Sequence, residues 1–274
     1  LGAYRHNEVD SSHPLCKLLQ SARDGRLPLQ EIRLGPLQPA RCHEMVSYIL
    51  DSPLAQTTAL SSFISTLSEG NPLFVSESLS YLHNERLLFL DEERQWRWDM
   101  DRVGRSRMPT TVAALFSSKI RRLPPDLIAL LEYCACMGNT FSSAELALIR
   151  GLTLLETFEI LKPALGLGLL IENKHRLQFV HDKVQEAALS AIPPERRRQI
   201  HWQVGRHLLD AALEDGADLE TLDSLFTIVS HLNLGRAPSL DARTAYLLSN
   251  LNYHAGNKAL DALATEAANR FFGL

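Results

Sequence analysis

The stretch FVHDKVQEAAL, residues 179–189, joins a strand-like apolar run to a His-Asp pair and then to an amphipathic helix. Val184, Ala187 and Ala188 fall on one face of that helix, which the pair Pro193-Pro194 ends. A short turn, NKHR, separates the run LQFV from an earlier apolar run, LLIE. This pattern predicts a β-hairpin followed by a helix.

Three helices are predicted before this hairpin. The first opens at Pro125 and stops at Gly138, and its apolar stripe is typical of a buried helix face. Its members are Leu127, Leu130, Leu131 and Cys134. The next two start at the capping-box pairs Ser142 with Glu145 and Thr153 with Glu156, in which each side chain accepts from a first-turn amide. Three helices and a hairpin predict a winged helix over 123–193.

The flanking residues divide into three further regions. The segment 1–38 shows strand-like patterns over Leu1–Val9 and Glu31–Leu37, which predict the end of an α/β core. The segment 39–122 has helical periodicity, with a second helix over about Phe74–Leu88 and a small hairpin in LLFLDEERQWRWDMD, and predicts a helical lid. The fold class is therefore mainly α with small β elements.

The last region, 194–274, is expected to be a helical arm. Gly256, Ala259, Ala268 and Phe272 match the small-residue and aromatic spacing of a tetratricopeptide helix pair, which predicts the start of TPR-like repeats. Because the chain begins without methionine and ends within a helical pattern, we expect it to be part of a larger protein.

Composition indicates a soluble globular protein. Hydrophobic residues make up 45% and charged residues 22% of the 274 residues, and the net charge of −4 gives no general reason to expect a nucleic acid or an anionic membrane as partner. No apolar run is long enough to span a bilayer, so we expect a cytoplasmic location. The four cysteines lack the spacing of a zinc site and are interpreted as ordinary thiols.

The residues argue against DNA binding and against catalysis. The third helix of the 123–193 unit, LTLLETFEILKPAL, offers two glutamates and a single lysine where a winged helix would contact bases. The basic run ERRRQIHWQ is interpreted as the solvated first turn of the next helix. The chain has no GxSxG, HExxH or Walker A motif, so we expect no enzyme activity, no metal site and no tight nucleotide binding by this chain alone.

Four motifs occur in a characteristic order: GAYRHNEVDSSHPL, EGNPLFVSESL, FVHDKVQEAALSAIP and LNYHAGNKA. In this order they resemble the AAA/STAND signalling ATPases of large multidomain bacterial sensor kinases, over essentially the whole chain. These proteins combine a serine/threonine-kinase domain, the ATPase, helical repeats, a GAF domain and a histidine kinase. The resemblance implies that the chain is the part of the ATPase after the Walker motifs.

The resemblance also implies three nucleotide-binding residues. Arg5 matches the sensor-1 arginine that reads the terminal phosphate, with a surface salt bridge as the alternative. Pro72 matches the lid proline that packs on adenine, with a simple helix start as the alternative. His181 matches the histidine of a Met-His-Asp motif, with Val180 in place of methionine, and would donate to the β-phosphate of ADP, whereas Asp182 would cap the following helix.

The function expected on this resemblance is a nucleotide-controlled switch. ADP, held by the upstream nucleotide-binding half of the protein, would keep the winged helix closed, and exchange for ATP would release it toward protein partners of the helical arm. Two alternatives stay open: a nucleotide-independent interaction scaffold, and part of an ATPase-type transcription activator.

Overall fold

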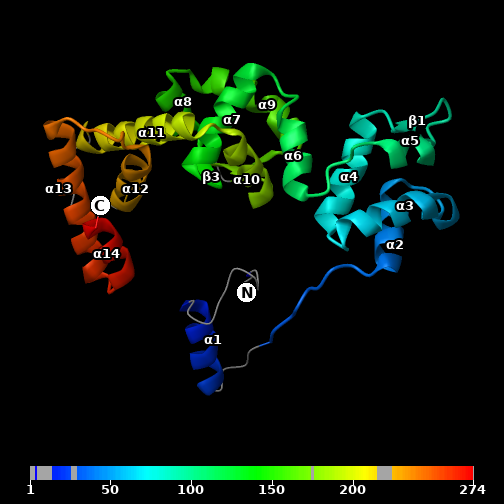
Figure 1. Ribbon diagram of the computed structural model, residues 1–274, viewed down its shortest axis with the longest axis horizontal. Helices are drawn as coiled ribbons and strands as arrows, with labels where there is room; N and C mark the ends of the chain where they lie inside the picture. The colour runs from blue at the N-terminus through cyan, green and yellow to red at the C-terminus, as the bar shows by residue number, and fades with distance from the viewer. Residues whose placement is uncertain (1–3, 5–13, 26–29, 174–175, 215–223, 274) are drawn as a thin grey trace.

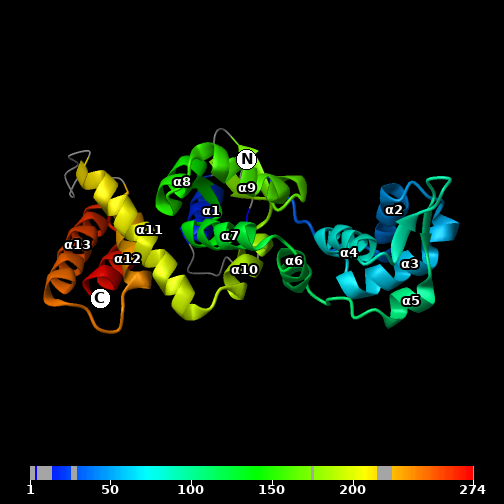
Figure 2. The same cartoon turned by 90° about the horizontal axis from the view of Figure 1, so that it is seen from above.

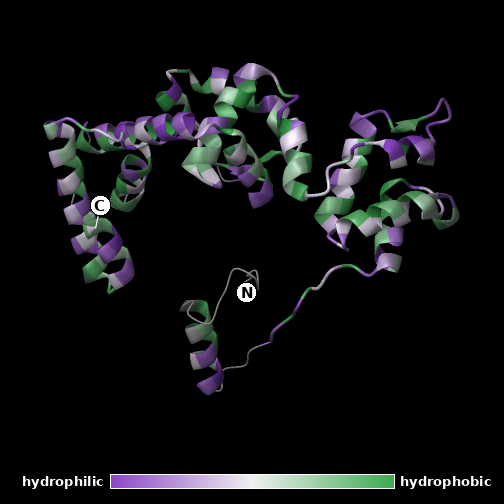
Figure 3. Cartoon of the chain, in the orientation of Figure 1, coloured by the Kyte–Doolittle hydropathy of each residue, from purple (hydrophilic) through white to green (hydrophobic). Residues whose placement is uncertain are grey.

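The chain forms an elongated, mainly helical structure. The computed structural model describes residues 4, 14–25, 30–173, 176–214 and 224–273. Figures 1 and 2 show α2 to α5 at one end, α7 to α10 in the middle and α11 to α14 at the other end. The apolar residues gather where the helices face one another (Figure 3). Among the described helices, none is both long and apolar enough to cross a bilayer.

The N-terminal region differs from the expectation of a strand. Helix α1 (Pro14–Asp24) lies apart from the other helices in Figure 1, and 30–38 is extended without strand pairing. The predicted strand Glu31–Leu37 is therefore wrong. Ile32 and Leu34 are 76% and 93% exposed, and an alternating run forms a strand only where a neighbour pairs with its backbone. The expected strand Leu1–Val9 lies, apart from Tyr4, outside the described residues, as does Arg5.

The region 39–122 packs around its own core, which includes Val46, Leu60, Ile64 and Val75. Its elements are α2 (Pro39–Ile49), α3 (Leu54–Ser68), α4 (Pro72–Asn84), β1 (Leu88–Leu90), β2 (Trp96–Trp98), α5 (Met100–Arg105) and α6 (Val112–Ile120). The predicted hairpin is confirmed, because β1 and β2 pair antiparallel and both tryptophans pack against this core.

The helix predicted over about Phe74–Leu88 ends earlier, at Asn84. Arg86 has a left-handed backbone conformation (φ 56°), which a helix cannot continue through. The turn at Arg86 releases Leu88 to begin β1, where its side chain is buried.

The region 123–193 contains the predicted three helices and hairpin. Its elements are α7 (Pro125–Met137), β3 (Thr140–Ser142), α8 (Ser143–Arg150), α9 (Leu154–Gly166), β4 (Leu170–Asn173), β5 (Arg176–Phe179) and α10 (Asp182–Ala191). The short strand β3, which the sequence did not predict, pairs with β5 and gives an antiparallel sheet of order β3-β5-β4. The Thr153–Glu156 capping box is complete, and Ser142 accepts from the Glu145 amide.

The region 194–274 is helical, as predicted. It contains α11 (Pro194–Glu214), α12 (Leu225–Gly235), α13 (Ala242–Asp261) and α14 (Thr265–Phe272). A Cβ on Gly256 would lie 2.2 Å from the Phe272 ring, so α13 and α14 approach closely at the small residue. The assignment of these helices to TPR-like repeats stays a prediction.

The basic run at the start of α11 is not simply solvated. Arg196 Nε lies 3.1 Å from Glu132 Oε2 on α7, and Arg197 donates to the backbone oxygen of Leu189. Charge-assisted contacts of this kind attach α11 to the preceding unit. The interpretation as a purely solvated turn is therefore wrong.

Helix α6 connects the regions 39–122 and 123–193. Its Leu115 belongs to the core of 39–122, whereas Phe116 and Ile120 belong to the core of 123–193. Leu73, in the first turn of α4, also packs against the core of 123–193. The region 39–122, for which the name lid is kept only as a label, and the region 123–193, called the middle unit, are therefore continuous through α6 and the start of α4.

Candidate functional site

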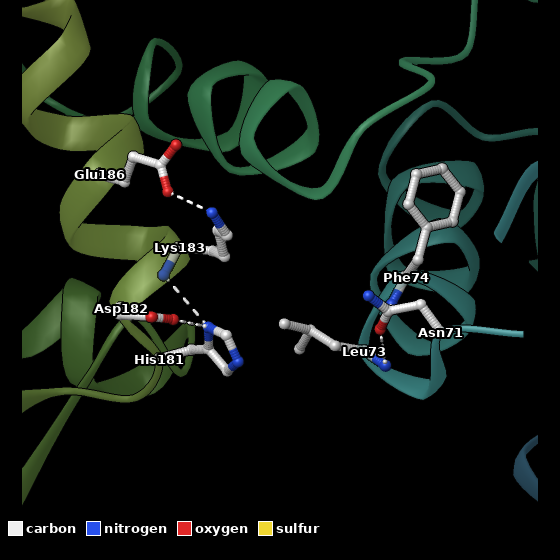
Figure 4. Close-up of polar contacts among 7 residues, drawn as sticks. All are labelled: Asn71, Leu73, Phe74, His181, Asp182, Lys183 and Glu186. Carbon is white, nitrogen blue, oxygen red and sulfur yellow. Dashed lines mark hydrogen bonds and ion pairs between the residues drawn. The ribbon is translucent and has the colours of Figure 1, made fainter. Parts of the chain in front are cut away.

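The starts of two helices, α4 and α10, face each other across the contact between the lid and the middle unit (Figure 4). Pro72 is the first residue of α4, and His181 directly precedes α10. Figure 4 shows the side chain of Leu73, the residue that follows Pro72, directed toward His181. Arg5, the third residue predicted to bind nucleotide, lies outside the described residues.

The start of α4 is closed by a side-chain cap. The Asn71 side-chain oxygen accepts from the amides of Leu73 and Phe74, at 3.0 and 3.3 Å. Pro72, at the first helical position, has no amide hydrogen to donate, and proline is favoured there. Its ring is exposed, so a flat ligand surface can pack against it. The helix-start alternative for Pro72 and the ligand role are compatible with each other.

The start of α10 is capped by His181 and not by Asp182. Because α10 begins at Asp182, the capping position falls one residue earlier, and His181 Nδ1 accepts from the Lys183 amide at 3.1 Å. The prediction that Asp182 caps this helix is wrong. Asp182 instead occupies the first turn, where its negative charge is stabilised by the helix dipole.

His181 can use only one of two contacts at Nδ1. The same atom lies 2.5 Å from Asp182 Oδ1, an approach that requires a proton on Nδ1, whereas capping of the Lys183 amide requires Nδ1 to be unprotonated. In the capping form a neutral ring carries its proton on Nε2. Figure 4 shows that Nε2 points away from α10 toward the start of α4. Capping therefore prepares Nε2–H as an outward-facing hydrogen-bond donor.

This arrangement can contact one edge of a nucleotide but does not enclose it. Asn71 already accepts from two first-turn amides of α4 and His181 from the Lys183 amide of α10, and Lys183 Nζ lies 2.5 Å from Glu186 Oε2. What the site offers an anion is the Nε2–H group and the positive ends of two helix dipoles. No cluster of three or more metal-ligating side chains occurs in the described part of the chain.

Sequence reasoning missed a second polar site, between α11 and α12. His201 and His231 are both buried, and their Nδ1 atoms lie 3.0 Å apart. Burial lowers the pKa of both rings, that of His231 to about 4, and nearby Arg197 adds to the effect on His201. Thirty residues separate the two histidines, so no local spacing indicates the pair.

The comparisons with known proteins place the chain near two signalling kinases. It is 22% identical to hybrid signal transduction histidine kinase G of Dictyostelium discoideum, over 99% of this chain and 9% of that protein. It is 24% identical to peroxide stress-activated histidine kinase mak2 of Schizosaccharomyces pombe, over 80% of this chain and 10% of that protein. The chain spans about a tenth of the length of these relatives.

No protein-family model and no solved structure matches the chain. Both relatives come from eukaryotes, so they do not support the bacterial source that the sequence resemblance implied. What the comparisons do support is a distant similarity to histidine kinases of signal transduction.

Proposed function

We propose that this chain is a regulatory part of a larger signal-transduction kinase, in which its lid and middle unit close on a nucleotide held by upstream residues. The distant similarity to two histidine kinases supports the signalling role. The observation that carries the nucleotide role is the position of His181 Nε2, which points toward the start of α4 (Figure 4), the helix whose first residue is Pro72. The proposal places no catalytic step in this chain.

The proposal identifies 123–193 as a winged helix and 194–274 as the start of a helical-repeat arm. The order helix, strand, two helices and hairpin supports the first assignment, and the tight Gly256–Phe272 contact supports the second. Release of His181 from a phosphate would weaken the contact between the lid and the middle unit, and α11 is attached to that unit through Arg196. The arm would then present a changed surface to protein partners.

Calorimetric titration of ADP and ATP tests the proposal. The titrations use the 274-residue chain and a protein extended upstream through the expected phosphate loop. We expect tight ADP binding only by the extended protein. His181→Asn is the informative variant, because asparagine keeps a capping acceptor for α10 but removes the imidazole donor. The loss of one hydrogen bond to a charged group should weaken ADP binding about tenfold or more.

Asp182→Asn is the matched comparison, since it removes the carboxylate that competes for Nδ1 and should therefore keep Nε2–H and bind ADP at least as tightly as the unaltered protein. Equal ADP affinity of the unaltered protein and the His181→Asn variant, with unchanged melting temperatures, would refute the role of His181. Absence of ADP binding by the extended protein would refute the switch and favour the nucleotide-independent scaffold.

A further inference from the structure

A cavity of about 300 Å³ lies between the second half of α4 and α6. Tyr81 and Asn84 line it from α4, Ser118 and Lys119 from α6, and Leu167 from the residue that follows α9. It differs from the site at His181, which faces the first turn of α4. The volume is at the lower end of the range for small-molecule pockets.

Lys119 is a cation that the protein satisfies only in part. Its ammonium lies 3.5 Å from the Glu77 carboxylate, the limit of a hydrogen bond, and the two side chains are only 16% and 17% exposed. Among the described residues Glu77 is its sole polar partner. An ammonium carries three donors, and a desolvated charge is costly unless its donors are used. Lys119 is therefore prepared to bind a further acceptor, best of all an anionic one.

Neutral hydrogen-bonding groups lie beside this cation. Ser118 and Tyr81 are among the residues that line the cavity, and no hydrogen bond is made by either hydroxyl within the described ranges. Burial is the main cause that raises the pKa of Tyr81, with the Glu85 carboxylate adding to it. Tyr81 therefore stays a protonated donor near neutral pH. The two hydroxyls can complete the coordination of an anion held by Lys119.

The remaining wall is apolar, and Lys119 is the cation of the lining that keeps unused donors. Leu115 and Leu123 are buried and Leu167 is 42% exposed, so together they give an apolar surface to the body of a ligand. Arg122 is already paired with the Glu85 carboxylate, whereas the long contact between Lys119 and Glu77 leaves the other donors of Lys119 unused. An acceptor that carries a negative charge forms the strongest hydrogen bonds with these donors.

We infer that this cavity binds a small organic monoanion with an apolar body. The anionic group lies on Lys119 and the two hydroxyls, and the body packs against the leucines. Because residues of both the lid and the middle unit line the cavity, the bound acid holds the two regions together. This inference does not depend on the nucleotide site, and a failure of one leaves the other unaffected.

Titration calorimetry of the 274-residue chain with indole-3-carboxylate tests the inference. Indole-3-carboxamide, which has nearly the same shape but no charge, is the matched probe. We expect the acid to bind at a single site and the amide to bind about tenfold more weakly or not at all. Equal affinities for acid and amide, or no heat with the acid at millimolar concentration, would overturn the inference.

Variants locate the site. Lys119→Met should lower the affinity for the acid by about tenfold or more. Because this change leaves Glu77 without its cation, the double variant Glu77→Gln/Lys119→Met repeats the measurement with the charge balanced. Lys162→Met, which removes an exposed lysine paired with Glu159 on α9, is the control and should bind normally. Undiminished binding by a folded double variant would refute the assignment to this cavity.

Discussion

Acidification should loosen the contact between α11 and α12, because His201 and His231 meet there with little access to solvent. One ring donates Nδ1–H and the other accepts at Nδ1, so the contact is built for two neutral rings. Arg197 lies close enough to disfavour a further positive charge on His201. A proton added to either ring introduces a charge that the folded chain solvates poorly.

The magnitude follows from the pKa of His231, which burial lowers from 6.5 to about 4. Above pH 6.5 the ring is neutral in the folded and the unfolded chain, so the free energy of unfolding does not depend on it. Between pH 6.5 and about 4 only the unfolded chain binds the proton, and the folded state loses stability. At about 1.4 kcal/mol per pH unit the total loss is about 3 kcal/mol, and His201 adds to it in the same direction.

Urea unfolding at a series of pH values measures this loss. Trp202 lies on α11, and the other two tryptophans, Trp96 and Trp98, lie in the hairpin of the lid. Replacing these two with phenylalanine makes the fluorescence of Trp202 a reporter of the α11–α12 contact.

The variant His231→Gln keeps an amide that can bond to His201 but does not titrate. We expect the free energy of unfolding of the parent protein to fall by about 3 kcal/mol more than that of the variant between pH 7 and 4. His207→Gln, at a part-exposed position on α11, is the control and should follow the parent. Parallel pH profiles for parent and His231→Gln would refute the reasoning.

Two further predictions, one on a substitution and one on a labelling reaction, follow from the packing. Gly235→Ala should destabilise the chain by about 1–3 kcal/mol in urea unfolding, since the new Cβ would lie 2.2 Å from the backbone nitrogen of Trp202. Gly104→Ala, whose Cβ would meet nothing within 4 Å, should be neutral or slightly stabilising. Iodoacetamide should label the part-exposed Cys16 long before Cys136, because burial raises the pKa of the Cys136 thiol to about 11. Peptide mass spectrometry measures the two labelling rates, and faster labelling of Cys136 would contradict this prediction.

Local chemistry explains why much of the helical structure could be predicted from the sequence. The stripe on α7, the Thr153–Glu156 box and the hairpin of β1 and β2 each depend on residues close together in the chain. The strand over Glu31–Leu37 failed because a strand needs a partner, which periodicity does not supply. The cap at α10 failed because the rule that favours aspartate at a helix start does not fix which residue comes first.

The features most relevant to the candidate sites join residues far apart in sequence. Glu77 and Lys119 are 42 positions apart, and His201 and His231 are 30 apart. Their side chains meet only because hydrophobic faces bring α4 against α6 and α11 against α12. Glutamate, lysine and histidine on helix surfaces are ordinary in a sequence, and only the packing makes them partly desolvated. A single sequence therefore predicts the helices, whereas the polar pairs between them require the tertiary structure.

Helix α6 limits how the lid and the middle unit can move relative to each other. Its Leu115 lies in one core while Phe116 and Ile120 lie in the other, so a rotation of the lid that kept α6 in place would have to expose one of these buried side chains. Uncovering a side chain of this size costs about 1.5–3 kcal/mol, which a single new hydrogen bond to a charged group can match. The free energy of one hydrogen bond made or lost at His181 is therefore enough to shift the equilibrium between the closed and the rotated arrangement of the lid. This holds if α6 moves as one body with either the lid or the middle unit. Helix α6 also packs on α10, the helix that His181 caps. If α6 moved with the middle unit, His181 would therefore keep its position relative to α6. The contact that opened would then be the one between Leu73 and the core of 123–193.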